Sequence, residues 1–331
     1  MHNYRLRIIR GFLFLLIIGI MACEDVPHDN PLDPVNGNSG LVLSGKVSTF
    51  YQPRLEIENA VLQLKPGNRV ILSDARGNFA FNRMPPGNYT LYCQAEGYRA
   101  DSAEIELIQD HSHIFYLDGM PVFKQIELST QHIARWFQPE DIYFLEILTR
   151  VDDPDGIGDI NQVIYEIPNF SFTDTLMPDI ESGVFRKIIS VAELPVSTLH
   201  ALIGQAFYFY VTDDFGTVNR SDANYLTRIL EESPLLIAPT ELETVISGAI
   251  EFRWNPVNVP FDALLRIDLF QINSGIFERI DSVFPIEKNI TLQVYEKPVI
   301  PGDYFWRLLI VDYFGNSSAS KEGVFTVIST N

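Results

Sequence analysis

Apolar and polar residues alternate in short stretches along most of the chain after residue 40, and this pattern predicts β-strands. In Tyr89–Ala95, for example, every second residue is apolar, which places Cys93 on a face that meets a core. Similar runs, separated by turn residues, are Val42–Val47, Ala60–Leu64, Val70–Leu72, Phe79–Phe81, Tyr89–Ala95, Ala103–Ile108 and His113–Leu117. Short strands at this spacing predict a β-sandwich.

The same alternation returns in two later parts of the chain. Tyr143–Val151 and Phe207–Val211 predict strands of a second sandwich, with a short connecting helix between residues 192 and 204. Ile250–Trp254 and Leu265–Leu269 predict strands of a third. The chain is therefore predicted to be all-β, with three sandwiches in series.

The first residues have the layout of a secretory signal. Basic residues precede an apolar run, Gly11–Met21, which has only about eleven residues where a membrane-spanning helix needs roughly 17–25. The following tetrapeptide, Ile20–Cys23, resembles the lipobox of bacterial lipoproteins. This resemblance implies cleavage before Cys23, lipidation of its thiol, acylation of the new amine by a chain such as palmitate, and attachment to a membrane. We expect an outer-membrane lipoprotein of the cell envelope.

Residues 24–40 are rich in Pro, Asn, Asp and Gly and predict an extended, flexible tether. The acids directly after Cys23 also resemble a signal that sends some lipoproteins to the cell surface. Because an acidic spacer would look the same, the surface and the periplasmic face of the outer membrane both stay open.

The first sandwich carries a family resemblance. The residues concerned are Gly45, Val47, Ala60, Val61, Asp74, Gly77, Phe79, Phe81, Pro85–Tyr89, Ala95, Gly97 and Tyr98. In this order they resemble the carboxypeptidase regulatory-like domain, which implies a seven-stranded, transthyretin-like sandwich that serves as a non-catalytic module.

The second and third sandwiches resemble other modular domains. The second is similar to an immunoglobulin-like sandwich without its cysteine pair. The third resembles a fibronectin type III domain, because Trp254 lies on an early strand and Pro301-Gly302 leads into Tyr304. Tyr304 is placed to bind nearby backbone through its hydroxyl group.

These patterns divide the chain into five segments. We predict a signal peptide at 1–22, a tether at 23–40, and sandwiches at 41–119, 120–232 and 233–331.

Charge and cysteine content limit the partners and the chemistry. The formal net charge of −19 repels phosphate backbones, so nucleic acid is not expected as a partner. With Cys23 lipidated, Cys93 is the only remaining thiol, so no intramolecular disulfide can form. Its place in an alternating run indicates a core residue rather than a nucleophile.

One loop carries metal-binding chemistry. Asp152, Asp153, Asp155 and Asp159 are closely spaced around glycines between two predicted strands, and such carboxylates suit calcium. Ordinary turn chemistry is the competing interpretation, since Asp, Pro and Gly are common turn residues. Asp213 could join this loop if the fold brings the two together. However, Asp312 occupies the same place in a matching hairpin of the third sandwich, which indicates a turn role first. No other cofactor is expected.

Trp136 stands beside Arg135, before the first clear strand of the second sandwich. If it is exposed, its ring could stack on a sugar or anchor a partner protein. Packing at a domain junction is the interpretation that such a tryptophan favours first.

Sequence motifs for catalysis are missing. The chain has no Gly-x-Ser-x-Gly, no phosphate-binding glycine loop ending in Lys-Ser/Thr, and no His-Glu-x-x-His. We therefore predict a lipid-anchored, non-enzymatic protein that presents sandwiches for binding, docking or adhesion to another envelope protein or a glycan. The alternatives are an accessory hydrolase acting on polysaccharide or peptide through an unrecognised carboxylate site, or a calcium-stiffened spacer.

Overall fold

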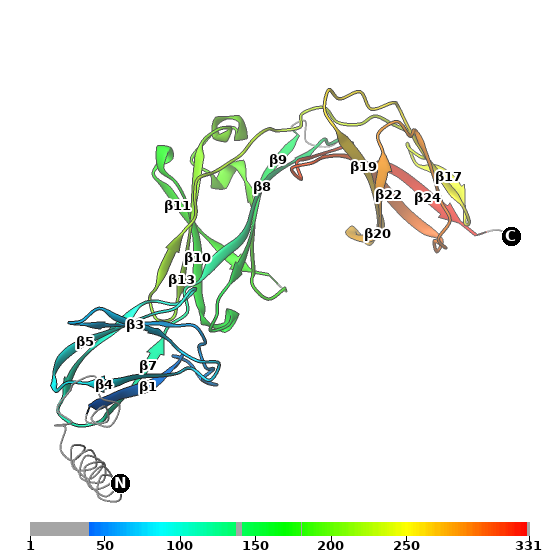
Figure 1. Ribbon diagram of the computed structural model, residues 1–331. Helices are drawn as coiled ribbons and strands as arrows, with labels where there is room; N and C mark the ends of the chain where they lie inside the picture. The colour runs from blue at the N-terminus through cyan, green and yellow to red at the C-terminus, as the bar shows by residue number, and fades with distance from the viewer. Residues whose placement is uncertain (1–39, 137–140, 180, 330–331) are drawn as a thin grey trace, which may run out of the picture. The chain divides into compact units, whose positions relative to one another are not determined.

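The computed structural model describes residues 40–136, 141–179 and 181–329. Cys23, the predicted signal peptide and nearly all of the predicted tether lie outside these residues. The described chain consists of strands and a few single-turn 3-10 helices, which confirms the all-β prediction (Figure 1). Within it, no helix has the length and apolar character that crossing a membrane requires. The chain divides into two compact units, 1–118 and 119–331, which are described separately.

The first unit is a two-layer sandwich. Its strands are β1 (Leu41–Thr49), β2 (Val61–Lys65), β3 (Arg69–Leu72), β4 (Asn78–Met84), β5 (Gly87–Gln94), β6 (Asp101–Leu107) and β7 (His111–Leu117). One layer has the order β4-β1-β7 and the other β3-β2-β5-β6. β1 and β7 are parallel, whereas the other neighbours are antiparallel. Each of the seven predicted runs overlaps one of these strands.

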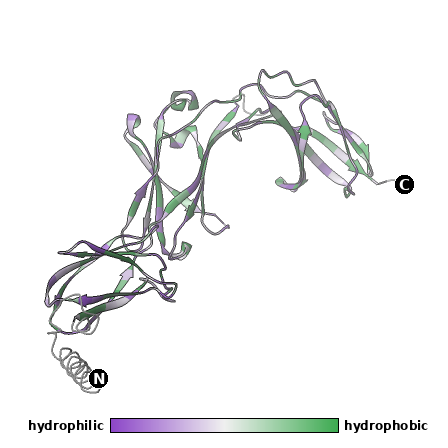
Figure 2. Cartoon of the chain, viewed as in Figure 1, coloured by the Kyte–Doolittle hydropathy of each residue, from purple (hydrophilic) through white to green (hydrophobic). Residues whose placement is uncertain are grey.

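The core of the first unit comes from the inward side of each alternating run. Hydrophobic and hydrophilic residues follow one another along its strands (Figure 2). Leu91 and Cys93 of β5 are both buried, and burial, followed by the nearby charge of Asp101, raises the pKa of the Cys93 thiol to about 12. Cys93 is therefore a core residue, as predicted, and carries no reactive thiolate.

The second sandwich begins the second unit. Its elements are β8 (Val122–Ile133), β9 (Ile142–Asp152), η1 (Ile157–Asp159), β10 (Ile160–Ile167), η2 (Pro168–Phe170), β11 (Phe172–Pro178), β12 (Val184–Ser190), η3 (Val191–Glu193), η4 (Leu199–Leu202), β13 (Ala206–Asp213), β14 (Val218–Arg220) and β15 (Asn224–Tyr225). β11-β10-β13-β14 form one layer and β12-β9-β8 the other, joined by a short β11–β12 pairing. The predicted connecting helix is present as the 3-10 turns η3 and η4.

The third sandwich completes the second unit. Its strands are β16 (Leu236–Ala238), β17 (Glu243–Ile246), β18 (Ile250–Trp254), β19 (Ala263–Asn273), β20 (Ile276–Glu287), β21 (Leu292–Tyr295), β22 (Gly302–Asp312), β23 (Ser317–Ala319) and β24 (Gly323–Ile328). β16-β18-β21 form one layer, and β17, β24, β22, β19 and β20 the other. The hydroxyl group of Tyr304 donates to the carbonyl oxygen of Ile300 at 2.7 Å, which confirms its predicted role.

The second and third sandwiches share hydrogen bonds between strands. β23 pairs in parallel with the end of β8, so that His132 lies opposite Ser318, and the two sandwiches form part of one hydrogen-bonded sheet. Beside this pairing, the buried side chain of Asn316 accepts hydrogen bonds from the amide and hydroxyl groups of Thr130 at 2.9 and 3.1 Å. Buried, satisfied polar contacts of this kind hold one geometry. The joint between these sandwiches is therefore structured rather than a free linker.

Candidate functional site

Two loops bring acidic side chains together at one end of the second sandwich. Asp153 and Asp159 lie in the loop between β9 and β10, and Asp213 ends β13, just before its hairpin with β14. A backbone hydrogen bond from the Asp214 amide to the Asp159 carbonyl, at 2.8 Å, holds the two loops side by side. Antiparallel pairing of β10 with β13 sets Ile160 opposite Asp213 and so creates this neighbourhood.

The three carboxyl groups are close and buried. Each of Asp153, Asp159 and Asp213 offers a carboxylate oxygen, and these oxygens all lie within 4.8 Å of one another. The exposed fractions are 5% for Asp153, 7% for Asp159 and 2% for Asp213. An arrangement of buried oxygen ligands from two loops can hold a hard cation.

The electrostatics of Asp153 reflect this setting. Burial raises the pKa of its carboxyl group to about 6, a hydrogen bond from the Asp155 amide opposes that rise, and the charges of Asp159, Asp155 and Asp213 add to it. Burial also raises the pKa of Asp155, against a hydrogen bond from the Gly119 amide, and the charge of Asp213 contributes. Both raised pKa values mean that burial and the neighbouring carboxylates disfavour the ionised forms of Asp153 and Asp155.

Asp152 does not join the group, although the sequence suggested it as a ligand. It is the last residue of β9, and its exposed side chain forms an ion pair with Lys124 at 3.4 Å. Alternation along the strand explains this, because consecutive side chains point to opposite faces. Asp155 lies near this group, and the Gly119 amide donates a hydrogen bond to Asp155 Oδ2 at 2.6 Å. Asp213, which sequence reasoning assigned to turn chemistry, belongs to the group.

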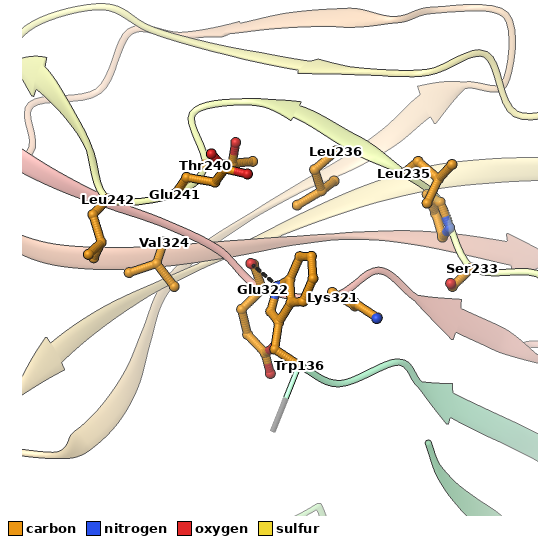
Figure 3. A pocket seen from close by; sticks show the side chains of 11 residues that line it. Trp136, Ser233, Leu235, Leu236, Thr240, Glu241, Leu242, Lys321, Glu322 and Val324 are labelled. Carbon is orange, nitrogen blue, oxygen red and sulfur yellow. Dashed lines mark hydrogen bonds between the residues drawn. The ribbon is translucent and has the colours of Figure 1, made fainter. Parts of the chain in front are cut away.

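A second candidate site surrounds Trp136, which lies three residues beyond the end of β8 at Ile133. A cavity of about 540 Å³ lies there, and its apolar lining includes Leu235, Leu236, Leu242 and Val324 (Figure 3). The polar residues Thr240, Glu241, Lys321 and Glu322 also line it. This volume is within the range of ordinary ligand pockets.

The Trp136 side chain is both exposed and held in place. Its exposed fraction is 68%, yet its Nε1 donates to the carbonyl oxygen of Glu322 at 2.9 Å, the contact marked in Figure 3. The Lys321 ammonium lies 4.5 Å from the ring centroid, a cation–π contact. Trp136 therefore contacts the third sandwich at the junction and also presents its ring to solvent.

Comparisons with known proteins add little beyond the fold. Neither protein-family models nor curated protein sequences match this chain. Among solved structures, it is similar to fibronectin(III)-like modules of Clostridium thermocellum CbhA, with 12% identity, coverage of 64% of this chain and 94% of that one, and a TM-score of 0.28. Another is the chicken CNTN1 FN1-FN3 domains, with 12% identity, coverage of 63% and 65%, and a TM-score of 0.22.

A third similar structure is a protein of Bacteroides uniformis described as carbohydrate-binding. It has 8% identity, coverage of 57% of this chain and 99% of that one, and a TM-score of 0.24. Scores this low carry no argument about what this chain binds. Its own residues therefore provide the evidence for its function.

Proposed function

We propose that this chain is a lipid-anchored, non-enzymatic protein of the bacterial cell envelope whose sandwiches dock another envelope protein. The observation that carries the proposal is the cavity beside Trp136, where an exposed aromatic ring stands among exposed aliphatic side chains. Exposed apolar groups that gather in one place are typical of protein interaction sites. Tryptophan is also among the residues that contribute most to binding at such sites.

The lining of the cavity favours an apolar protein segment over a sugar. Aliphatic side chains of Leu235, Leu236, Leu242 and Val324 make up much of the wall, and they offer no hydrogen bonds to sugar hydroxyl groups. Burial of their exposed surface against partner side chains would instead stabilise a complex through the hydrophobic effect. The acidic charge of the chain favours a partner with a basic surface around its apolar segment.

The joint between the sandwiches supports this role because it holds the cavity walls before a partner arrives. Trp136 extends from β8 of the second sandwich, whereas the leucines and Val324 belong to the third. Parallel pairing of β8 with β23 and the buried Thr130–Asn316 contacts fix these parts together. A preorganised site loses less conformational entropy on binding than one that must first assemble.

Lipid anchoring is tested with the two cysteines of the chain. In cells, Cys23→Ala should leave an uncleaved precursor that carries no lipid. Cys93→Ala is the matched control, because Cys93 is buried in the first sandwich, and it should stay processed and membrane-bound. Normal processing and membrane retention of Cys23→Ala would overturn the anchoring proposal.

Docking is tested by site-specific photo-crosslinking in cells. A photoreactive amino acid at position 136 should give an adduct with one defined envelope protein, and Trp136→Ala should weaken the purified complex at least tenfold. The same amino acid at Tyr313, which is highly exposed and outside the cavity lining, should give no such adduct. Equal adducts at both positions would contradict the proposal. Glycan binding that Trp136→Ala abolishes would assign the cavity to a sugar instead.

A further inference from the structure

Buried carboxylate oxygens in the second sandwich lack a hydrogen-bond partner among the described residues. They include Oδ2 of Asp153 and Oδ2 of Asp213. The other oxygen of each group is bound, because Asp153 Oδ1 accepts from the Asp155 amide at 2.8 Å and Asp213 Oδ1 accepts from the Thr217 amide at 2.7 Å. Hydrogen bonds within the turns thus engage one carboxylate oxygen of each aspartate and leave its Oδ2 without a hydrogen bond from the described residues.

Such an arrangement is unfavourable for the protein alone. Buried polar groups in proteins nearly always have a partner, and a buried charge without one is costly. Here the charges also repel one another, since Asp153, Asp159 and Asp213 offer oxygens within 4.8 Å. A cation bound to these oxygens would offset the electrostatic repulsion between the carboxylates.

We infer that Asp153, Asp159 and Asp213 bind a divalent cation, and that this cation is calcium. The three ligands are carboxylate oxygens, the donors that calcium prefers, and none is the nitrogen or sulfur that favours zinc or copper. Their mutual separations of at most 4.8 Å suit ligands of one ion, because two ligands of a calcium ion at a calcium–oxygen distance of about 2.4 Å lie no more than about 4.8 Å apart. Water and nearby backbone carbonyl groups would complete the coordination.

The ion would add a cross-link between two loops that lie side by side. The Asp214 amide donates to the Asp159 carbonyl oxygen in the loop after β9, and the Asn161 side chain, at the start of β10, donates to the Asp214 carboxylate at 3.1 Å. A cation bound by Asp153 and Asp159 from one loop and by Asp213 from the other would cross-link them. Calcium thereby stabilises this end of the second sandwich, independently of the cavity at Trp136.

The test uses the full chain, purified with chelator and then dialysed at pH 7.5. Titration with calcium chloride should show one site per chain with a Kd of about 10⁻⁴–10⁻³ M, as in extracellular modules. At calcium concentrations about 100-fold above the Kd, the folding equilibrium constant rises about 100-fold, so the melting temperature of the second unit should increase. Absence of both binding heat and a melting shift would overturn the inference.

Variants separate metal binding from simple unfolding. Asp213→Asn keeps an oxygen for the Thr217 amide but removes one repelling charge. It should therefore bind calcium at least tenfold more weakly while its melting temperature in chelator equals or exceeds that of the unmodified chain. Asp214→Asn, which changes the exposed neighbour, is the matched control and should keep the full calcium response.

Two further results would contradict the assignment of the ligands or of the ion. If Asp213→Asn binds calcium as tightly as the unmodified chain, the assigned ligands are wrong. If magnesium chloride raises the melting temperature as much as calcium chloride at the same concentration, the assignment to calcium fails. A selective calcium effect that Asp153→Asn also abolishes supports it.

Discussion

Two hairpins of the second unit have the same local structure and different surroundings. One follows β13 with Asp213 at its start, and the other follows β22 with Asp312. In each, the aspartate carbonyl accepts from the amide of a glycine three residues later, at 3.2 Å after Asp213 and 3.1 Å after Asp312. Both glycines, Gly216 and Gly315, have positive φ values, of 91° and 82°. In each hairpin Oδ1 also accepts a backbone amide four residues on.

The second carboxylate oxygen distinguishes the two. Asp312 Oδ2 accepts from the Asn316 side chain at 3.0 Å and pairs with the Arg228 guanidinium at 3.3 Å. Asp213 Oδ2 has no hydrogen-bond partner among the described residues, and its carboxyl group belongs with two further aspartates. Asp312 is thus paired with a cationic side chain, whereas no cationic side chain among the described residues pairs with Asp213. The turn motif therefore determines the hydrogen bonds of Oδ1, and the neighbouring elements determine which groups surround Oδ2.

The largest expected effect comes from truncating the two aspartates. Asp312→Ala should lower the free energy of unfolding by about 3 kcal/mol, because Arg228, Asn316 and two amides lose a buried acceptor. Asp213→Ala in chelator should cost less than about 1 kcal/mol, since the lost amide contact is offset by reduced repulsion. Urea denaturation of the full chain measures both. Equal losses would show that the two carboxyl groups have the same role.

An intermediate effect should follow from filling the space beside the acidic loop. A Cβ atom on Gly119 would lie 2.7 Å from Asp153 Oδ1 and 3.1 Å from the Asp155 nitrogen. Gly119→Ala should therefore displace the loop, destabilise the second unit by about 1–3 kcal/mol and weaken calcium binding. In the same loop, Gly158 has nothing within 4 Å of such an atom, so Gly158→Ala should change neither property. Melting curves with and without calcium compare the pair, and a harmless Gly119→Ala would contradict the described packing.

The smallest effect is expected at Asp152, directly beside the proposed ligands in the sequence. Asp152→Asn removes a solvent-exposed ion pair with Lys124 and should change stability by less than about 0.5 kcal/mol. Its calcium affinity should match that of the unmodified chain. A strong loss of affinity, measured by the same titration, would mean that Asp152 turns inward when the ion binds.

Much of the fold follows from local patterns. The seven runs of the first unit were predictable because alternation has a period of two and each strand buries one face. The positions of Cys93 and Tyr304 follow from the same logic and from a Pro-Gly turn that leads into the strand. The shared sheet of the second and third sandwiches was not predictable. His132 and Ser318 are 186 residues apart, and parallel pairing over three residues has no local signal.

The candidate sites were predictable only in part. The sequence singled out the acidic loop and Trp136, but it included Asp152 and did not place Asp213 with the acidic loop, although the turn role that it gave Asp213 is present. The side to which a strand-end residue points depends on register, and register depends on which strands pair. Likewise, the leucines beside Trp136 come from a different sandwich, so only the folded joint brings them together.

The sequence by itself determined the all-β class, the strand runs, the buried thiol and the turn chemistry of both hairpins, because each depends on residues close along the chain. Only the tertiary structure decided which aspartate oxygens meet a cationic side chain and which meet other carboxylates. The physical reason is that hydrogen bonds within a turn act over a few residues. Charge compensation, by contrast, acts through space between strands that pairing brings together.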